Sequence, residues 1–221
     1  MPEFNLKIVI AHRNRSLNLL PTGEVLTLFP NLVQSLNAAC GELELADPEL
    51  RVSLLVVDAG ARSDGAPLAG WLPASARFPV RLIDASIAEA GRAFNKGRLL
   101  NLALASISEP GPVFVCDTDM LLSARLLQRI RKHVEAGDVF APVCWSRRSH
   151  AGADGWWRDT GSGMIAFNWT PEDQVRYVEK DTWGGEDWLF ISALRARGLR
   201  VVRENADIIH QWHPPQLGWG A

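Results

Sequence analysis

Short apolar runs recur along the first two thirds of the chain, and several of them end in an acidic residue. They occupy residues 6–10, 52–58, 80–84, 113–117 and 139–143. Apolar runs of about four to eight residues, rich in Val and Ile, are typical of strands that are buried on both faces. The sequence therefore predicts a sheet built from these segments.

The segments between these runs carry apolar residues at helical spacing. Residues 25–40, 94–105 and 123–136 follow this pattern, although Pro30 interrupts the first of them near its start. Ser123 can cap a helix and Gly137 can end one. Strands that alternate with helices predict an α/β fold with a central, mostly parallel mixed sheet flanked by helices.

The chain after residue 144 has a different character. Residues 145–163 are rich in Gly, Trp, Arg and Asp, which predicts a long surface loop, and long loops in compact domains are often functional. A strand is expected at 164–167, and the order Thr-Pro-Glu-Asp at 170–173 is that of a helix start. Further segments follow: a helix at 186–197, a strand at 199–202 and an irregular tail from His210.

Composition places the chain among ordinary globular proteins. Its 221 residues are 47% hydrophobic and carry a formal charge of −2, so a core can form and a basic surface for nucleic acid is not expected. The apolar runs are far shorter than the roughly 18 residues of a membrane span, and the first residues do not form a signal peptide. We expect an unexported chain in a reducing cytoplasm, with buried free thiols at Cys40, Cys116 and Cys144.

Acidic residues follow several predicted strands at the point where each strand ends. Asp58, Asp84, Asp117 and Asp119 occupy such positions, and in open α/β sheets ligands bind beyond the carboxyl ends of the strands. Asp117 and Asp119 flank Thr118, so in an extended chain both carboxylates point the same way and favour a divalent cation that neutralises them. The alternative is that Asp117 caps a turn and Asp119 is solvated.

The block Trp183-Gly184-Gly185-Glu186-Asp187-Trp188 is the second candidate site. Its glycines allow the backbone to approach a ligand closely. Acids at a helix start are favoured by the helix dipole and remain available as a base. The flanking tryptophans can stack on the apolar side of a sugar ring. The alternative is a glycine turn with first-turn acids, and with Trp183 in the core.

Basic side chains supply two weaker signals. His210 and His213 are three residues apart and can place two imidazoles on one cation, although such a pair in an irregular tail is more often a surface feature. Arg13, Arg15 and Lys96 lie beside predicted elements and can pair with phosphates, or else belong to a solvated face.

Taken in order, these motifs resemble the motif series of the GT-A glycosyltransferases. The matching segments are residues 11–15 (AHRNR), 94–101 (FNKGRLLN), 117–119 (DTD), 161–164 (GSGM) and 183–187 (WGGED). The likeness is closest to the β-1,4-galactosyltransferases, the polypeptide N-acetylgalactosaminyltransferases and the bacterial chondroitin-polymerase-type enzymes. It implies a single GT-A domain over 1–221, with a nucleotide-binding half at 1–120 and an acceptor-binding half at 121–221.

The resemblance also implies roles for individual residues. Asp187 matches the catalytic base of the inverting members, and Glu186 beside it would contact a sugar. A divalent metal, Mn²⁺ or Mg²⁺, would be held by Asp119 together with His210 or His213. The donor-binding positions are Arg13, Arg15, Asp58, Lys96, Asp117 (which also belongs to the metal motif), Thr118, Gly163, Trp183 and Gly185.

These roles describe the transfer of a hexose or N-acetylhexosamine from a nucleotide-diphosphate sugar, expected to be a UDP-sugar, to the hydroxyl of a carbohydrate or glycoconjugate acceptor. Retaining relatives carry Asn where Asp187 stands, so inversion is expected. The galactosyltransferase block often continues with a third acid, which is Trp188 here, so the acceptor preference of those relatives does not carry over. Because their membrane anchor and stem are absent, a bacterial-type enzyme in the cytoplasm, or at the inner face of a membrane, is expected.

Two alternative functions belong to other classes of protein. A carbohydrate- or nucleotide-binding domain without catalysis would also use Trp-rich loops, although the retained acids at 117, 119, 186 and 187 argue against it. A sugar-nucleotide pyrophosphorylase shares the α/β plan but normally opens with a Gly-rich phosphate loop, which residues 12–15 do not form.

Overall fold

The computed structural model describes residues 3–13, 17–20, 22–60, 68–173, 175–181 and 184–214. Its centre is a seven-stranded sheet with the order β12-β8-β11-β6-β1-β4-β5. The pairs β6/β1, β1/β4, β4/β5 and β12/β8 are parallel, and β11 runs antiparallel to both of its neighbours. The strands are β1 (Phe4–His12), β4 (Leu50–Asp58), β5 (Val80–Asp84), β6 (Gly111–Val115), β8 (Val139–Phe140), β11 (Ile165–Trp169) and β12 (Val201–Val202).

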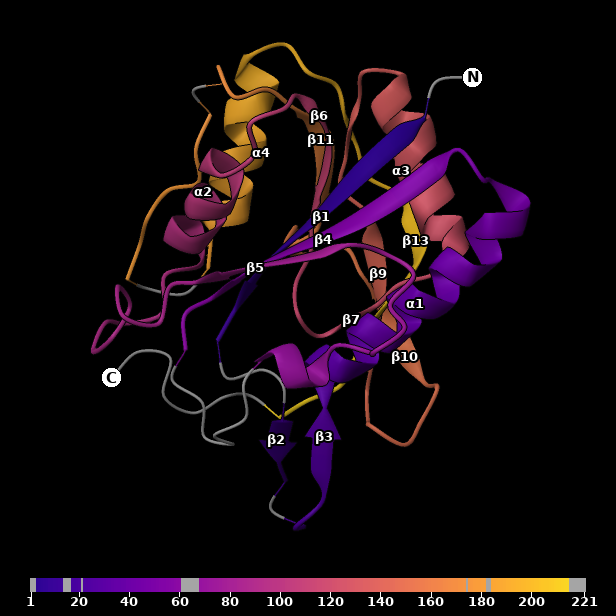
Figure 1. Ribbon diagram of the computed structural model, residues 1–221, viewed down its shortest axis with the longest axis vertical. Helices are drawn as coiled ribbons and strands as arrows, with labels where there is room; N and C mark the ends of the chain where they lie inside the picture. Colours follow the sequence, from indigo (N-terminus) through magenta and orange to yellow (C-terminus); the bar gives the residue numbers. More distant parts are fainter. Residues whose placement is uncertain are drawn as a thin grey trace.

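Two smaller sheets complete the strand structure. A four-stranded sheet has the order β10-β9-β13-β7, and a two-stranded hairpin β2-β3 extends away from it at the bottom of Figure 1. Their strands are β2 (Leu17–Leu19), β3 (Val25–Thr27), β7 (Met120–Leu121), β9 (Val143–Arg147), β10 (Gly155–Arg158) and β13 (Asn205–His210).

Helices cover both faces of the large sheet. Figure 1 shows α2 (Lys96–Ala105) and α4 (Glu186–Ala196) on one side, and α1 (Leu28–Ala46) and α3 (Ala124–Glu135) on the other. Because side chains alternate along a strand, Ile8 and Ile10 of β1 join the hydrophobic cluster beneath α1 and α3, whereas Val9 joins the cluster beneath α2 and α4. A short 3₁₀ helix (Leu68–Trp71) follows β4 along the chain. This arrangement explains the uninterrupted apolar runs of the central strands.

The α/β class and the mostly parallel mixed sheet predicted from the sequence are confirmed. Ser123 caps α3 as predicted, its Oγ accepting a hydrogen bond from the Leu126 N–H at 3.1 Å. Pro30 does not interrupt α1, because the helix begins at Leu28. A proline in the first turn removes only an N–H that has no partner within the helix.

The second half departs from expectation in three places. Residues 145–163 do not form one long loop, because β9 extends to Arg147 and β10 pairs with it. The Thr-Pro-Glu-Asp segment at 170–173 forms a turn and not a helix start. The Asn101 side chain binds both backbone groups of Tyr177 (2.9 and 2.8 Å), which holds the chain after this turn in a non-helical conformation against α2. The tail is irregular over residues 211–214 as expected, but His210 itself is the last residue of β13.

The remaining structural expectations concern thiols and membrane spans. Cys40, Cys116 and Cys144 are buried and free, as predicted. Burial raises the pKa of the Cys40 and Cys144 thiols to about 11, so both stay protonated near neutral pH. Among the described residues, no helix combines the length and the apolar character that a membrane span requires.

Candidate functional site

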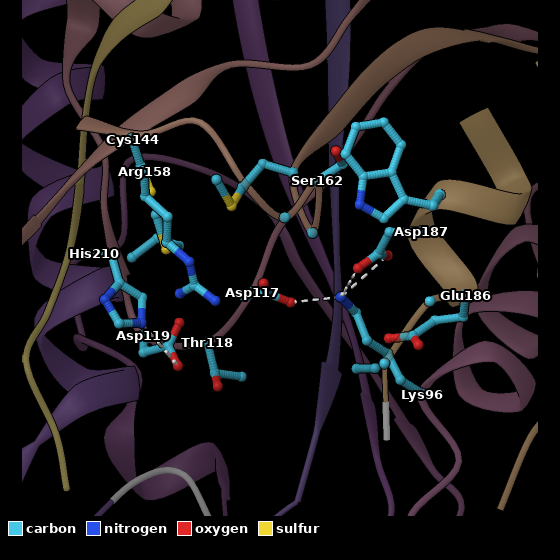
Figure 2. A pocket seen from close by; sticks show the side chains of 18 of the residues that line it. Lys96, Asp117, Thr118, Asp119, Cys144, Arg158, Ser162, Glu186, Asp187 and His210 are labelled. Atoms are coloured by element: carbon cyan, nitrogen blue, oxygen red, sulfur yellow. Dashed lines mark hydrogen bonds and ion pairs between the residues drawn. The ribbon is translucent and has the colours of Figure 1, made fainter. Parts of the chain in front are cut away.

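A cavity of about 290 Å³ lies beyond the carboxyl end of β6, at the position where α/β sheets bind ligands. One wall comes from the large sheet and from the N-termini of α2 and α4. The other wall is a face of the four-stranded sheet, called the small sheet below, which contributes Met120, Cys144, Arg158 and His210. Figure 2 shows how acidic and basic side chains from these elements converge on this space. Most of the residues predicted from the sequence meet here.

Lys96 joins the two acidic motifs that the sequence had singled out. Its Nζ lies 2.7 Å from Asp117 Oδ1 and 3.2 Å from both carboxylate oxygens of Asp187 (Figure 2). Burial alone would lower the pKa of Lys96, but the two carboxylates outweigh it and hold that pKa well above its ordinary value. The buried cation therefore fixes the end of β6 and the start of α4 relative to each other.

The segment around Lys96 explains why the side chain reaches this point. Asn95 caps α2, its Oδ1 accepting a hydrogen bond from the Arg98 N–H at 2.9 Å. Lys96 is therefore the first helical residue, and its side chain extends from the N-terminus of the helix. At Gly97 a Cβ would lie 2.3 Å from the Val178 carbonyl oxygen. Only glycine allows the chain near Tyr177 to pack this closely on α2.

The N-terminus of α4 presents the proposed base. Gly184 and Gly185 have φ values of 95° and 87°, a left-handed conformation that favours glycine. This turn places Glu186 and Asp187 in the first turn of the helix. Burial raises the pKa of Asp187 to about 6, Lys96 opposes this shift, and Asp117 and Glu186 add to it.

Glu186 is the second acid of this turn. It is buried, and among the described residues its Oε2 has no hydrogen-bond partner. A buried carboxylate oxygen without a partner is costly, and Glu186 lines the cavity. A sugar hydroxyl in the cavity could supply the missing donor.

Asp119, His210 and His213 form a cluster that fits a divalent cation. One ligand atom from each residue lies within 4.8 Å of the others, and Asp119 Oδ2 is 3.2 Å from His213 Nε2 and 4.0 Å from His210 Nε2. His213 Nδ1 donates to the Pro214 carbonyl at 2.9 Å, which orients the ring with its Nε2 towards Asp119. Burial lowers the pKa of His210 despite the opposing effect of Asp119, so that imidazole is neutral near pH 7. The sequence left the choice of histidine open, and the structure brings both to Asp119.

Gln211 ties this cluster to the fold. Its backbone N–H donates to the Asp119 carbonyl at 2.8 Å, and its Nε2 donates to the Leu28 carbonyl at 3.0 Å. Its Oε1 accepts from Asn31 Nδ2 at 2.8 Å. The segment between the two histidines is therefore held against the start of α1.

Asp117 lies apart from the histidine cluster and faces Lys96. A Cβ at Gly163 would lie only 2.1 Å from Asp117 Oδ2. Only glycine at this position, two residues before β11, leaves room for the carboxylate. The predicted part of Asp117 in metal binding stays a prediction, because among the described residues Asp117 pairs with Lys96 and does not belong to the cluster around Asp119.

The other predicted donor-binding residues divide into those in the cavity and those elsewhere. Arg13, Thr118 and Gly185 line it, and Arg13 Nη1 donates to the Arg92 carbonyl at 2.8 Å. Asp58 does not line it. Its Oδ1 lies 3.1 Å from His12 Nδ1 and accepts from the Gly60 N–H at 3.1 Å, at the end of β4. Arg15 and Trp183 lie outside the described residues.

Sequence reasoning missed Arg158, which also lines the cavity. It follows the two tryptophans at 156 and 157, inside the segment that was interpreted as a loop. No motif marks it, because its place at the cavity depends on the pairing of β10 with β9.

Comparisons with known proteins identify sequence relatives and structures of similar fold. No protein family model matches the chain. Mouse N-acetyl-beta-glucosaminyl-glycoprotein 4-beta-N-acetylgalactosaminyltransferase 1 is 29% identical over 138 residues, covering 57% of this chain and 13% of that protein. Mouse chondroitin sulfate N-acetylgalactosaminyltransferase 2 is 30% identical over 145 residues, covering 54% of this chain and 27% of that protein. The chain thus spans only a small part of the length of these relatives.

A solved structure extends the likeness to almost the whole chain. S. aureus TarS 1–349 in complex with UDP-GlcNAc matches 96% of this chain and 60% of its own, with a TM-score of 0.60 at 13% identity. At this identity the likeness shows the fold. The predicted resemblance is confirmed: the chain is a sequence relative of glycosyltransferases and has the GT-A fold of nucleotide-diphospho-sugar transferases.

Proposed function

We propose that this chain is a metal-dependent glycosyltransferase that moves a hexose or N-acetylhexosamine from a UDP-sugar to an acceptor hydroxyl, with inversion at the anomeric carbon. The observation that carries the proposal is that one cavity is lined both by a buried acid with a pKa of about 6 and by Asp119 and His210 of a carboxylate–imidazole cluster suited to a cation. The names of the two relatives support N-acetylgalactosamine as the first sugar to test. The TarS complex supports a uridine diphosphate donor.

The donor would lie between β6 and the small sheet. Asp119, His210 and His213 would hold the divalent metal, and two imidazoles favour Mn²⁺ over Mg²⁺, which prefers oxygen ligands. When bound, the metal would neutralise the diphosphate and stabilise the departing nucleoside diphosphate. The donor-binding roles of Arg13, Thr118 and the other cavity residues belong to this proposal.

Asp187 would take the proton of the acceptor hydroxyl as the oxygen of that hydroxyl attacks the anomeric carbon. A pKa of about 6 keeps this carboxylate ionised at neutral pH yet more basic than an exposed aspartate, which suits a general base. Lys96 holds both carboxylate oxygens at 3.2 Å and so orients the group. Glu186 would accept a hydrogen bond from a sugar hydroxyl through its unpartnered Oε2.

A binding domain without catalysis is the competing function. Buried acids with raised pKa values are costly and cluster at catalytic sites, so Asp187 favours the enzyme. A carbohydrate- or nucleotide-binding domain can bind its ligand as the enzyme does, but only the enzyme releases UDP from a UDP-sugar.

Donor binding is tested by thermal unfolding with UDP, GDP, ADP and CDP, each with and without Mn²⁺. A ligand at a hundred times its Kd adds about 2.7 kcal/mol to the folded state, which corresponds to a rise in Tm of about 5–10 °C for a domain of this size. We expect a Mn²⁺-dependent rise with UDP that is lost in Asp119→Ala. Asp207→Ala removes a half-exposed carboxylate on β13 outside the cavity and is the matched control. No rise with any nucleotide, or an equal rise in Asp119→Ala, would contradict the proposal.

A further inference from the structure

Arg158 brings a positive charge to the same wall of the cavity as the metal cluster. In the register of the small sheet, Arg158 lies opposite Cys144 of β9, and Ser146 of β9 lies opposite His210 of β13. Cys144 and Ser146 are two residues apart and face the same side. Arg158 and His210 therefore share one face of this sheet, and Figure 2 shows the guanidinium between His210 and Asp117, beside Asp119.

Among the described residues, the acids closest to Arg158 pair with other groups. Asp117 is paired with Lys96 at 2.7 Å, and Asp119 lies against His213 at 3.2 Å. Within the described part of the chain, no carboxylate forms an ion pair with Arg158, whereas Lys96 has two acidic partners. A guanidinium that lines a cavity without a counter-ion is suited to an anionic ligand.

The chain segment at residues 159–162 lies beside this guanidinium and is itself fixed by Arg203. A Cβ at Gly161 would lie 3.7 and 3.8 Å from Nε and Nη2 of Arg158, so the backbone there packs against the side chain. Arg203 fixes that segment by donating to the Asp159 and Gly161 carbonyls at 2.7 and 3.0 Å and to Ser162 Oγ. Arg203 in turn lies 5.3 Å over the Trp188 ring at the start of α4.

We propose that Arg158 binds the diphosphate of the donor, on the side of the cavity where His210 and Asp119 lie, and stabilises it as it departs. This inference rests on the proposed function and names a contact that the sequence motifs did not include. As the acceptor oxygen bonds to the anomeric carbon, the bond between that carbon and the β-phosphate oxygen breaks. The β-phosphate oxygen keeps the electron pair, and the acceptor proton passes to Asp187. The planar guanidinium can hold two oxygens of the diphosphate at once as this negative charge develops.

The test compares UDP and uridine binding, each with Mn²⁺, in wild type, Arg158→Gln and Arg158→Lys. We expect Arg158→Gln to weaken UDP about ten- to a hundredfold, the loss typical of a hydrogen-bonded charged contact. Arg158→Lys should lose less, and uridine affinity should not change. Arg148→Gln, an exposed arginine on the same hairpin outside the cavity, is the matched control and should bind UDP as wild type does.

Three results would overturn the inference. Unchanged UDP affinity in Arg158→Gln would do so, even if the acceptor KM rose, because Arg158 would then bind an anionic group of the acceptor. An equal loss of uridine and UDP affinity would point to general disruption of the site. A wild-type chain that binds no UDP would overturn the proposed function together with the inference, whereas the first two results leave that function standing.

Discussion

Replacing Lys96 by Met removes the only described cation that forms ion pairs with both Asp117 and Asp187. A unit charge 3.2 Å from each oxygen of Asp187 contributes roughly 5 kcal/mol of attraction at an effective dielectric constant of about 20. Desolvation offsets part of this, and losing one partner of a buried pair typically costs about 3–5 kcal/mol. The Asp117 side chain is 36% exposed and is screened by solvent. We therefore expect the free energy of unfolding of Lys96→Met to be about 3 kcal/mol lower than that of wild type at pH 8.

The loss should depend on pH through Asp187. Its pKa in the folded protein, about 6, already exceeds the ordinary value of 3.8, so the protonated form stabilises the fold at low pH and this contribution is lost as pH rises through 6. Without Lys96 the carboxyl stays protonated to higher pH. The difference in unfolding free energy between wild type and Lys96→Met should thus be small at pH 5 and grow towards pH 8.

The same change should move the activity profile. Release of UDP from a UDP-sugar can be followed with water as acceptor, and in wild type kcat/KM should fall about tenfold per pH unit below pH 6. In Lys96→Met this acidic limb should move up by about one to three pH units, the usual effect of a neighbouring charge. Lys132→Met removes an exposed charge from α3 and is the control. An unshifted limb, with a loss of stability that is equal at pH 5 and pH 8, would refute the reasoning.

Two further substitutions test the geometry of the site. Gly163→Ala places a Cβ 2.1 Å from Asp117 Oδ2, so UDP release should fall at least about tenfold, whereas Gly70→Ala, where a Cβ meets nothing within 4 Å, should leave it unchanged; equal activities would contradict the close approach. Gln211→Leu removes the side-chain hydrogen bonds that hold the histidine segment, and Mn²⁺ affinity measured by titration should fall about ten- to a hundredfold. An unchanged Mn²⁺ affinity would show that Gln211 does not position the cluster.

The central strands β1 and β4 could be predicted because they are buried on both faces. Burial on both faces produces continuous apolar runs such as the one in β4. In the second half, β9 and β10 lie in a small sheet with exposed tryptophans at 156 and 157, so their composition resembles that of a loop. β13 did show a signal, since Ala206 and Ile208 are buried between the exposed Asn205 and Asp207.

The candidate site was predictable where one short motif carries it. Asp119 and Asp187 were identified from the ends of a strand and a turn, because these positions face ligands in any α/β sheet. The bridging role of Lys96 was not, because it joins segments 21 and 91 residues apart in the sequence that only the fold brings together. Arg158 was missed for the same reason, because only the register between β10, β9 and β13 places its side chain on the cavity wall beside His210.

The most direct test of the account compares donor turnover and UDP binding in wild type and Asp187→Asn. The variant keeps the shape of the side chain but cannot accept the acceptor proton, and loss of a general base typically lowers turnover about 10²- to 10⁴-fold. We predict that loss in Mn²⁺-dependent UDP release from a UDP-sugar, with UDP affinity within about threefold of wild type. Turnover at the wild-type rate in Asp187→Asn would contradict the proposed base, and UDP binding without turnover in wild type would contradict catalysis altogether.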